Sequence, residues 1–174
     1  MKTLLAPFAL ALALALPGPL AAQASDKVTA NNPKAVADLL ELTGFKPELG
    51  TDNTGDPKID LEIADYFAAI YFYGCDEDTH DGCDSLQLQA SFDRKDPWPA
   101  AEAIEVARKW RYGAVYLDDE GDPVVTWDIV TGDGIPSKVF LQGVRSFGDT
   151  LHEVADMVFP EDGSQDTSDD ADED

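Results

Sequence analysis

The most regular pattern in the chain lies near its C-terminal end. After Ser137, apolar residues recur at spacings of four and three until Pro160. This spacing places all of them on one face of an α-helix, so the pattern predicts a long helix that Ser137 caps and Pro160 ends. The residues on this face are Phe140, Val144, Phe147, Leu151, Val154 and Val158.

Two shorter helices are predicted upstream. Asn32 and Pro33 are a favourable N-cap and first helical residue, and Gly44 is a typical C-terminal stop. The second predicted helix covers residues 96–110, which begin with Asp-Pro and end with the basic pair Arg108 and Lys109. Basic residues at that end favour a helix because they interact with its dipole.

Extended segments fill the intervals between the helices. Residues 85–92 alternate strictly: Leu86, Leu88, Ala90 and Phe92 share one face, as in a strand buried on one side. Residues 45–51 predict a weaker strand, and Pro47 indicates the edge of a sheet. Residues 58–74 predict one long strand or two joined strands. The last two predicted strands cover 112–118 and 123–131.

The predicted order is α-β-β-β-α-β-β-α, and short turns join consecutive strands. This order indicates an α+β fold with an antiparallel sheet and helices packed on one face. The turn pattern D-x-x-G-D-P occurs twice, at 52–57 and 118–123. Aspartate and glycine favour tight turns, and the alternative is that these loops bind cations.

The N-terminal 24 residues predict a cleaved signal peptide. Lys2 precedes an apolar run from Leu4 to Leu16, and Ala22-Gln23-Ala24 resembles a cleavage site. The run is too short to span a bilayer, so no membrane insertion is expected after cleavage. We therefore predict three parts: a signal peptide at 1–24, one domain at 25–160, and a disordered acidic tail at 161–174. The expected location is the periplasm of a Gram-negative bacterium, or outside the cell.

The chain is strongly acidic, with 35 acidic and 12 basic residues and a net charge of −23. Such a charge repels phosphate backbones, so the sequence argues against nucleic-acid binding, and anionic membrane surfaces are disfavoured too. The charge has two open interpretations: solubility, or attraction to a basic partner or to cations.

Cys75 and Cys83 are the only cysteines. In an exported protein they are expected to form a disulfide at the neck of a hairpin, and strand alternation predicts both on the outer face. Two alternatives remain open. A metal site could use His80 and nearby aspartates, although a structural zinc site favours shorter cysteine spacing. A redox pair is disfavoured because the C-x-x-C pattern is absent.

No catalytic constellation is found, and no cofactor is expected. His80 lies among carboxylates, and His152 follows a core position of the last helix. The sequence offers instead a candidate face for a protein partner, comprising Tyr71, Tyr73, Trp110 and Arg111.

Several segments together resemble the YbjN family, which is described as a family of bacterial sensory transduction regulators. They are GTDNTGDPKI (50–59), YFYGC (71–75), KWRYGAVYLDDEGDPVVTWDI (109–129) and the final helix. The resemblance covers roughly residues 28–158 and takes an exported, disulfide-containing form. It implies a fold similar to type III secretion chaperones and a non-enzymatic regulatory or chaperone-like role, without catalytic residues.

The sequence therefore favours an exported binding module that engages a protein partner or forms a homodimer. One alternative is a structural or stress-related envelope protein without a specific ligand. A second, less favoured alternative is a metal-dependent hydrolase that uses scattered aspartates and His80.

Overall fold

The structure is a computed structural model, and it describes residues 26–160. Its helices are α1 (Pro33–Leu42), α2 (Ala100–Lys109) and α3 (Ser137–Val158). Its strands are β1 (Lys27–Val28), β2 (Glu48–Thr51), β3 (Pro57–Ile63), β4 (Tyr66–Tyr73), β5 (Ser85–Ser91), β6 (Gly113–Leu117), β7 (Pro123–Val130) and β8 (Ile135–Pro136). The predicted signal peptide and acidic tail lie outside the described residues.

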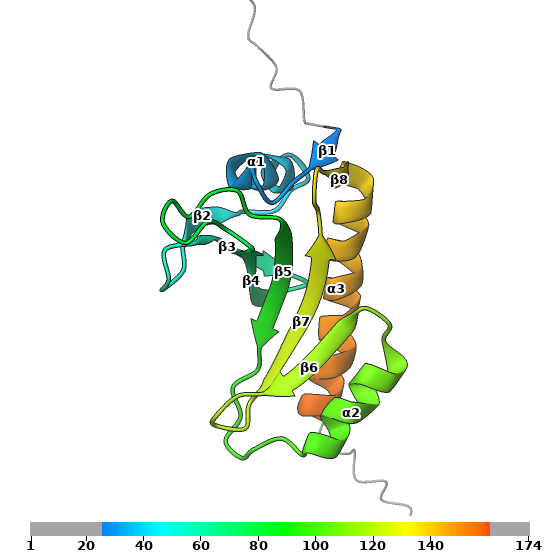
Figure 1. The fold of residues 1–174 in the computed structure, drawn as a ribbon. Helices are drawn as coiled ribbons and strands as arrows, with labels where there is room; N and C mark the ends of the chain where they lie inside the picture. The colour runs from blue at the N-terminus through cyan, green and yellow to red at the C-terminus, as the bar shows by residue number, and fades with distance from the viewer. Residues whose placement is uncertain (1–25, 161–174) are drawn as a thin grey trace, which may run out of the picture.

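Six strands form one antiparallel sheet in the order β2-β3-β4-β5-β7-β6. The helices contribute to the same hydrophobic core as the inner face of this sheet, and α3 runs along its back (Figure 1). The predicted α+β class, with an antiparallel sheet and helices on one face, is therefore confirmed. A second sheet pairs only the two-residue strands β1 and β8.

Helix α3 and strand β5 form as their patterns predict. All six residues of the α3 face are fully buried, and the inner-face residues of β5 are buried against them. Helix α1 begins as expected, because the Asn32 side chain accepts a hydrogen bond from the Ala35 backbone N–H at 3.1 Å. Near its other end Gly44 has a φ of 99°, which favours glycine.

The starts of two helices differ from the predictions, and two short strands are additional. Helix α2 begins at Ala100 rather than Asp96, because the Pro-Trp-Pro segment before it is not helical and buries Trp98. Ser137 is the first residue of α3 and not its cap; its backbone N–H donates to the Asp26 carbonyl at 3.0 Å. Strands β1 and β8 were not predicted.

Residues 58–74 form two strands, β3 and β4. Four strands therefore lie between α1 and α2, where the predicted order has three. The break is a two-residue hairpin at Ala64 and Asp65, closed by the pair Ile63 and Tyr66. Both turn residues have positive φ, 53° and 66°. This geometry is that of a type I′ turn, which usually contains asparagine and glycine. The local sequence gave little signal for it.

The hairpin predicts a position-specific effect on stability. Changing Asp65→Val should lower the free energy of unfolding by about 1–2 kcal/mol, because a β-branched residue at positive φ is strained. The matched control is Glu62→Val, at an exposed strand position of β3, which should change stability by less than about 0.5 kcal/mol. Chemical denaturation of both variants measures the difference, and equal effects would contradict the turn assignment.

Candidate partner-binding face

The outer face of the sheet carries a group of tyrosines. In β4, Ile70 and Phe72 point into the core, so strand alternation turns Tyr71 and Tyr73 to the opposite face. Their ring centroids are 6.5 Å apart. Tyr73 remains 45% exposed, so the pair presents aromatic surface that no helix covers.

A third tyrosine belongs to the same group. Tyr116 is on β6 and is 48% exposed. It shares its face with Tyr71 and Tyr73, because its neighbours Val115 and Leu117 on β6 pack against the core. We name the surface made by Tyr71, Tyr73 and Tyr116 the tyrosine face.

Burial and nearby charges act on these hydroxyls. Burial raises the pKa of Tyr73, and the neighbouring Tyr71 and Tyr116 raise it further. Burial likewise raises the pKa of Tyr116, with a further contribution from Tyr71. The hydroxyls of Tyr73 and Tyr116 therefore stay protonated at neutral pH and can donate as well as accept hydrogen bonds.

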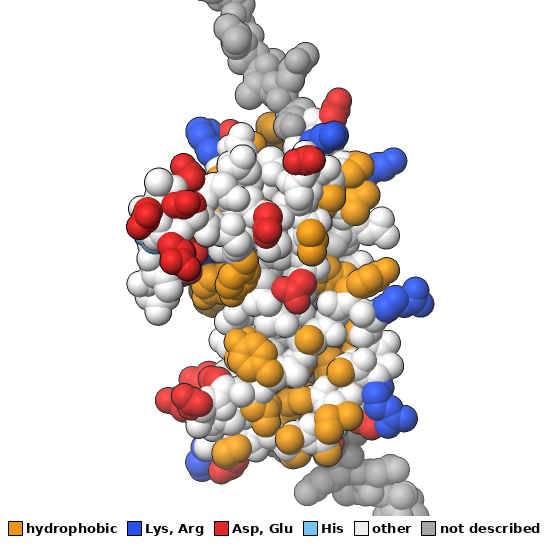
Figure 2. Space-filling view, viewed as in Figure 1, with side chains coloured by type: hydrophobic (Ala, Val, Ile, Leu, Met, Phe, Trp, Pro, Cys, Tyr) orange, Lys and Arg blue, Asp and Glu red, His pale blue; other side chains and the backbone are white. Residues whose placement is uncertain are grey.

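Acidic groups border the tyrosine face. Asp128 and Asp52 are close enough to Tyr73 to raise its pKa, and Asp118 acts on Tyr116 in the same way. The Gln87 side-chain amide holds the Asp128 carboxylate at 2.8 Å. Figure 2 shows apolar side chains gathered over β5, β7 and β6, with acidic side chains beside them. The surface thus combines apolar area with negative charge.

One lysine already lies against the tyrosine face. The ammonium of Lys58, on β3, is 5.9 Å from the Tyr71 ring centroid. Its pKa is raised, chiefly by a hydrogen bond to Asp60, whose carboxylate lies 3.0 Å away. This arrangement, an ammonium over an aromatic ring beside a carboxylate, is a favourable environment for a cation.

The other two candidate residues come from a different part of the chain. Trp110 and Arg111 lie between α2 and β6. Trp110 ends α2 and packs against the core, with the Lys109 ammonium 4.3 Å from its ring centroid. Arg111 is exposed. Trp110 therefore packs at the junction between helix and strand.

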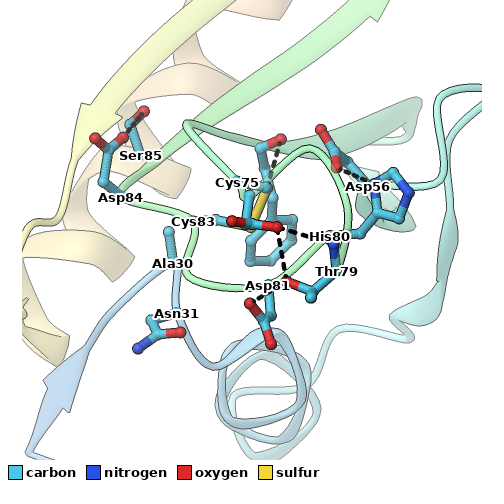
Figure 3. The surroundings of a disulfide bond; sticks show 12 residues. Ala30, Asn31, Asp56, Cys75, Thr79, His80, Asp81, Cys83, Asp84 and Ser85 are labelled. Carbon is cyan, nitrogen blue, oxygen red and sulfur yellow. Dashed lines mark hydrogen bonds and ion pairs between the residues drawn. A yellow bond between two sulfur atoms is a disulfide. The ribbon is translucent and has the colours of Figure 1, made fainter.

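Cys75 and Cys83 form a disulfide at the neck of the β4–β5 hairpin (Figure 3). The prediction that both thiols lie on the outer face is wrong for Cys83, which is 2% exposed and belongs to the hydrophobic core. The β4–β5 pairing ends at Tyr73 opposite Ser85, so strand alternation continues to neither cysteine. Gly74, with a φ of 70°, turns the chain away from β4 before Cys75. A Cβ on Gly74 would lie 2.5 Å from the Asp84 carboxylate.

The loop between the cysteines is tied to the turn at 52–57. The His80 Nδ1 atom lies 2.8 Å from the Asp56 carboxylate, as Figure 3 shows. The imidazole lies against Gly55, where an added Cβ would come within 3.0 Å of the ring. Within the loop, Asp76 accepts hydrogen bonds from the backbone N–H groups of Asp78 and Thr79. His80 is thus engaged in holding two loops together.

Both D-x-x-G-D-P segments form the expected turns. Asp52 Oδ1 accepts backbone hydrogen bonds from Thr54, Gly55 and Asp56, and Asp118 Oδ1 accepts from Glu120 and Asp122. In residues 26–160, no three histidine, cysteine, aspartate or glutamate side chains are grouped so that they could hold a metal ion. The first aspartate of each turn accepts hydrogen bonds from backbone N–H groups of the same turn, as the interpretation of these segments as tight turns predicts.

The family of the chain follows from comparison with known proteins. A model of the YbjN family, described as "Putative bacterial sensory transduction regulator", matches residues 32–160. The chain belongs to the YbjN family. No curated protein sequence matches it. Across the described residues, no helix has the length and apolar composition that crossing a membrane requires.

Solved structures share the fold at low identity. YbjN from E. coli is 14% identical, with a TM-score of 0.51 over 71% of this chain and 90% of that one. An uncharacterised protein from Methanothermobacter thermautotrophicus is 15% identical, with a TM-score of 0.54 over 76% and 99%. The Yersinia pestis type III secretion chaperone SycH, solved with a fragment of YscM2, is 11% identical, with a TM-score of 0.42 over 76% and 98%.

The disulfide should contribute measurably to stability. Replacing both cysteines, Cys75→Ala with Cys83→Ala, should lower the free energy of unfolding by about 2.5 kcal/mol, because the unfolded chain loses a short covalent loop. Denaturation with and without reductant measures this. Reductant should destabilise only the unchanged protein, and an unfolding curve that reductant leaves unaltered would contradict the prediction.

The stability that the turn at 52–57 contributes should depend on pH in the acid range. The hydroxyl of Thr54 and the backbone N–H groups hold the pKa of Asp52 below its usual 3.8. The carboxylate therefore stabilises the fold above about pH 3.8, and this contribution is lost as the pH falls through the lower folded pKa. NMR titration of the Asp52 carboxyl carbon measures that pKa. Thr54→Val should raise it and Thr54→Ser should keep it low, whereas equal values would contradict the role of the hydroxyl.

Proposed function

We propose that this protein is an exported, non-enzymatic regulatory module that binds a protein partner through the tyrosine face. The carrying observation is that three tyrosines stay exposed, wholly or in part, on the side of the sheet opposite the helices. Tyrosine is enriched in interfaces because it supplies a large apolar area with a polar end at low cost in conformational entropy. An exposed apolar surface bordered by polar groups is typical of an interaction site.

The chemistry of this surface favours a basic and hydrophobic segment of the partner. Asp128, Asp52 and Asp118 border the tyrosines and attract positive charge. The position of Lys58 over Tyr71 provides an internal example of the contact that a partner's lysine or arginine would make. A cation over an aromatic ring contributes about 0.5–1 kcal/mol at an exposed site. Several such contacts together give selectivity for basic segments.

The acidic residues that border the tyrosine face also disfavour a homodimer through this face. A symmetric dimer brings the same surface of both copies together. The carboxylates around each tyrosine face would then approach the carboxylates of the second copy, and like charges in an interface reduce affinity. A partner with the opposite charge avoids this repulsion.

Export is supported by the N-terminal pattern at 1–24 together with the disulfide. Disulfides persist in oxidising compartments and are rare in the cytosol. In this proposal residues 25–160 form the binding domain, and the acidic segment 161–174 follows it as a tail. A non-enzymatic role is supported by the contact of the His80 imidazole with the Asp56 carboxylate, which joins two loops, and by the contact of His152 with the Tyr66 ring.

Two tyrosine substitutions test the function. The double variant Tyr71→Ala with Tyr73→Ala should reduce the yield of a cross-linked partner in cells about tenfold or more, because it removes most of the aromatic contact area. The control is Tyr112→Ala, which removes a more exposed tyrosine that contacts Trp127 instead. Mass spectrometry of tagged protein after cross-linking gives both yields. An unchanged yield of the cross-linked partner with the double variant would contradict the proposal.

A further inference from the structure

Strand β3 is longer than the strand that covers its edge. Strand β2 pairs with β3 only from Thr51 opposite Pro57 to Glu48 opposite Asp60. The next three residues of β3, Leu61 to Ile63, pair with β4 on their other side. Within the described residues no strand lies along their free side. The last three of the seven residues of β3 thus have a free edge that is available for backbone pairing.

The chain itself leaves this position vacant for a physical reason. If β2 continued backwards, Pro47, Lys46 and Phe45 would stand opposite Leu61, Glu62 and Ile63. Proline lacks a backbone N–H and cannot donate to a ladder, so Pro47 is a natural end for the strand. From there the chain turns towards α1, and Phe45 donates a backbone hydrogen bond to Leu40 at 3.1 Å.

A cavity of about 490 Å³ lies along this edge. We name it the edge groove. Its lining residues are Gly44, Phe45, Lys46, Glu48, Asp60, Leu61, Glu62, Ala64, Asp65 and Phe67. Phe67 is 85% exposed and points out from the start of β4. The groove therefore offers a free strand edge between two phenylalanines.

The charge of the edge groove is one-sided. Four carboxylates line it (Glu48, Asp60, Glu62 and Asp65), against the ammonium of Lys46 and that of Lys58, which pairs with Asp60. A second copy of this chain would place its own carboxylates against these four, and the acidic segment 161–174 would do the same. A basic segment is the complementary occupant.

We propose that the edge groove binds an extended segment of a partner protein in which basic and apolar residues alternate. The segment adds a strand to β3 at Leu61–Ile63. Side chains alternate along a strand, so its apolar residues face the core side together with Phe45. Its basic residues face the outer side, where Glu62 stands opposite Phe67 and where Asp65 follows in the turn. This inference does not rest on the tyrosine face, and either surface can bind without the other.

The test uses a defined peptide, an acetylated and amidated hexapeptide of three lysine–valine repeats. Calorimetry should detect binding to the domain, and NMR should place the shifted amides at residues 61–67. A glutamate–valine hexapeptide should bind at least tenfold more weakly because of the carboxylates. Methylating alternate backbone nitrogens of the lysine–valine peptide should weaken binding by a similar factor, because an added strand needs those N–H groups.

Substitutions in the protein locate the site. The pair Glu62→Gln with Asp65→Asn should weaken binding by about threefold or more, since two exposed charges are removed. Asparagine also tolerates the positive φ of position 65. Phe67→Ala should weaken it by about threefold or more, because the lysine side chains of the peptide lose the aromatic ring beside them. The matched control, Glu102→Gln with Glu120→Gln, removes two exposed carboxylates elsewhere and should change nothing.

Several results would overturn the inference. They are an absence of binding, binding unchanged by methylation, and binding unchanged by the variants in the groove. If the double variant Tyr73→Ala with Tyr116→Ala lost peptide binding, the peptide would be assigned to the tyrosine face instead. The proposed function fails separately, when cross-linking of the cellular partner does not depend on Tyr71 and Tyr73.

Discussion

The packing of one long helix against one face of the sheet is the constraint on which the molecule depends. The apolar face of α3 is fully buried, and it meets the inner residues of β3, β5 and β7. Burying each such side chain contributes about 1.5–3 kcal/mol, so this contact supplies much of the core. The short helices α1 and α2 extend the same layer at its two ends (Figure 1). All helical cover is thus used on one face, and the opposite face stays open.

A hydrogen-bonded neck fixes the acidic loop relative to that open face. The Asp84 carbonyl accepts hydrogen bonds from the backbone N–H groups of Thr131 and Gly132, and also from the Thr131 hydroxyl. The same hydroxyl accepts from the Ala30 N–H at 2.9 Å. With the buried Cys83 beside it, this neck joins the β4–β5 hairpin to the N-terminal segment and to the end of β7. The loop at 76–82 is therefore held as a structural border of the sheet.

Elements governed by local periodicity could be predicted from the sequence. The faces of α3 and β5, the cap at Asn32 and the two aspartate turns follow from spacing and side-chain chemistry alone. The hairpin at Ala64–Asp65 lacked its usual glycine, so its position was left open. Strands β1 and β8 are two residues long and exist only because distant segments meet. The start of α2 depends on the burial of Trp98, which local pattern does not reveal.

The candidate site shows the same division. Alternation in β4 was enough to place Tyr71 and Tyr73 together on the outer face. Tyr116 joins them only because β7 lies between β5 and β6, an order that no local signal fixes. The inclusion of Trp110 and Arg111 in the same face stays a prediction. Cys83 is buried although alternation in β5 predicts the outer face, because the strand pairing begins only at Ser85 and the start of a strand is not dictated by local pattern.

The distribution of charge, more than its total, decides what the open surfaces can select. At physiological salt, charges more than about 8 Å apart are largely screened from one another. Most of the acidic residues therefore do little at a given contact beyond keeping molecules apart. The carboxylates that matter are those beside an apolar surface: Asp128 and Asp52 at the tyrosine face, Glu62 and Asp65 at the edge groove. Each surface supplies apolar area for affinity and nearby negative charge for selectivity. A purely hydrophobic partner would gain the apolar contact but not the electrostatic attraction.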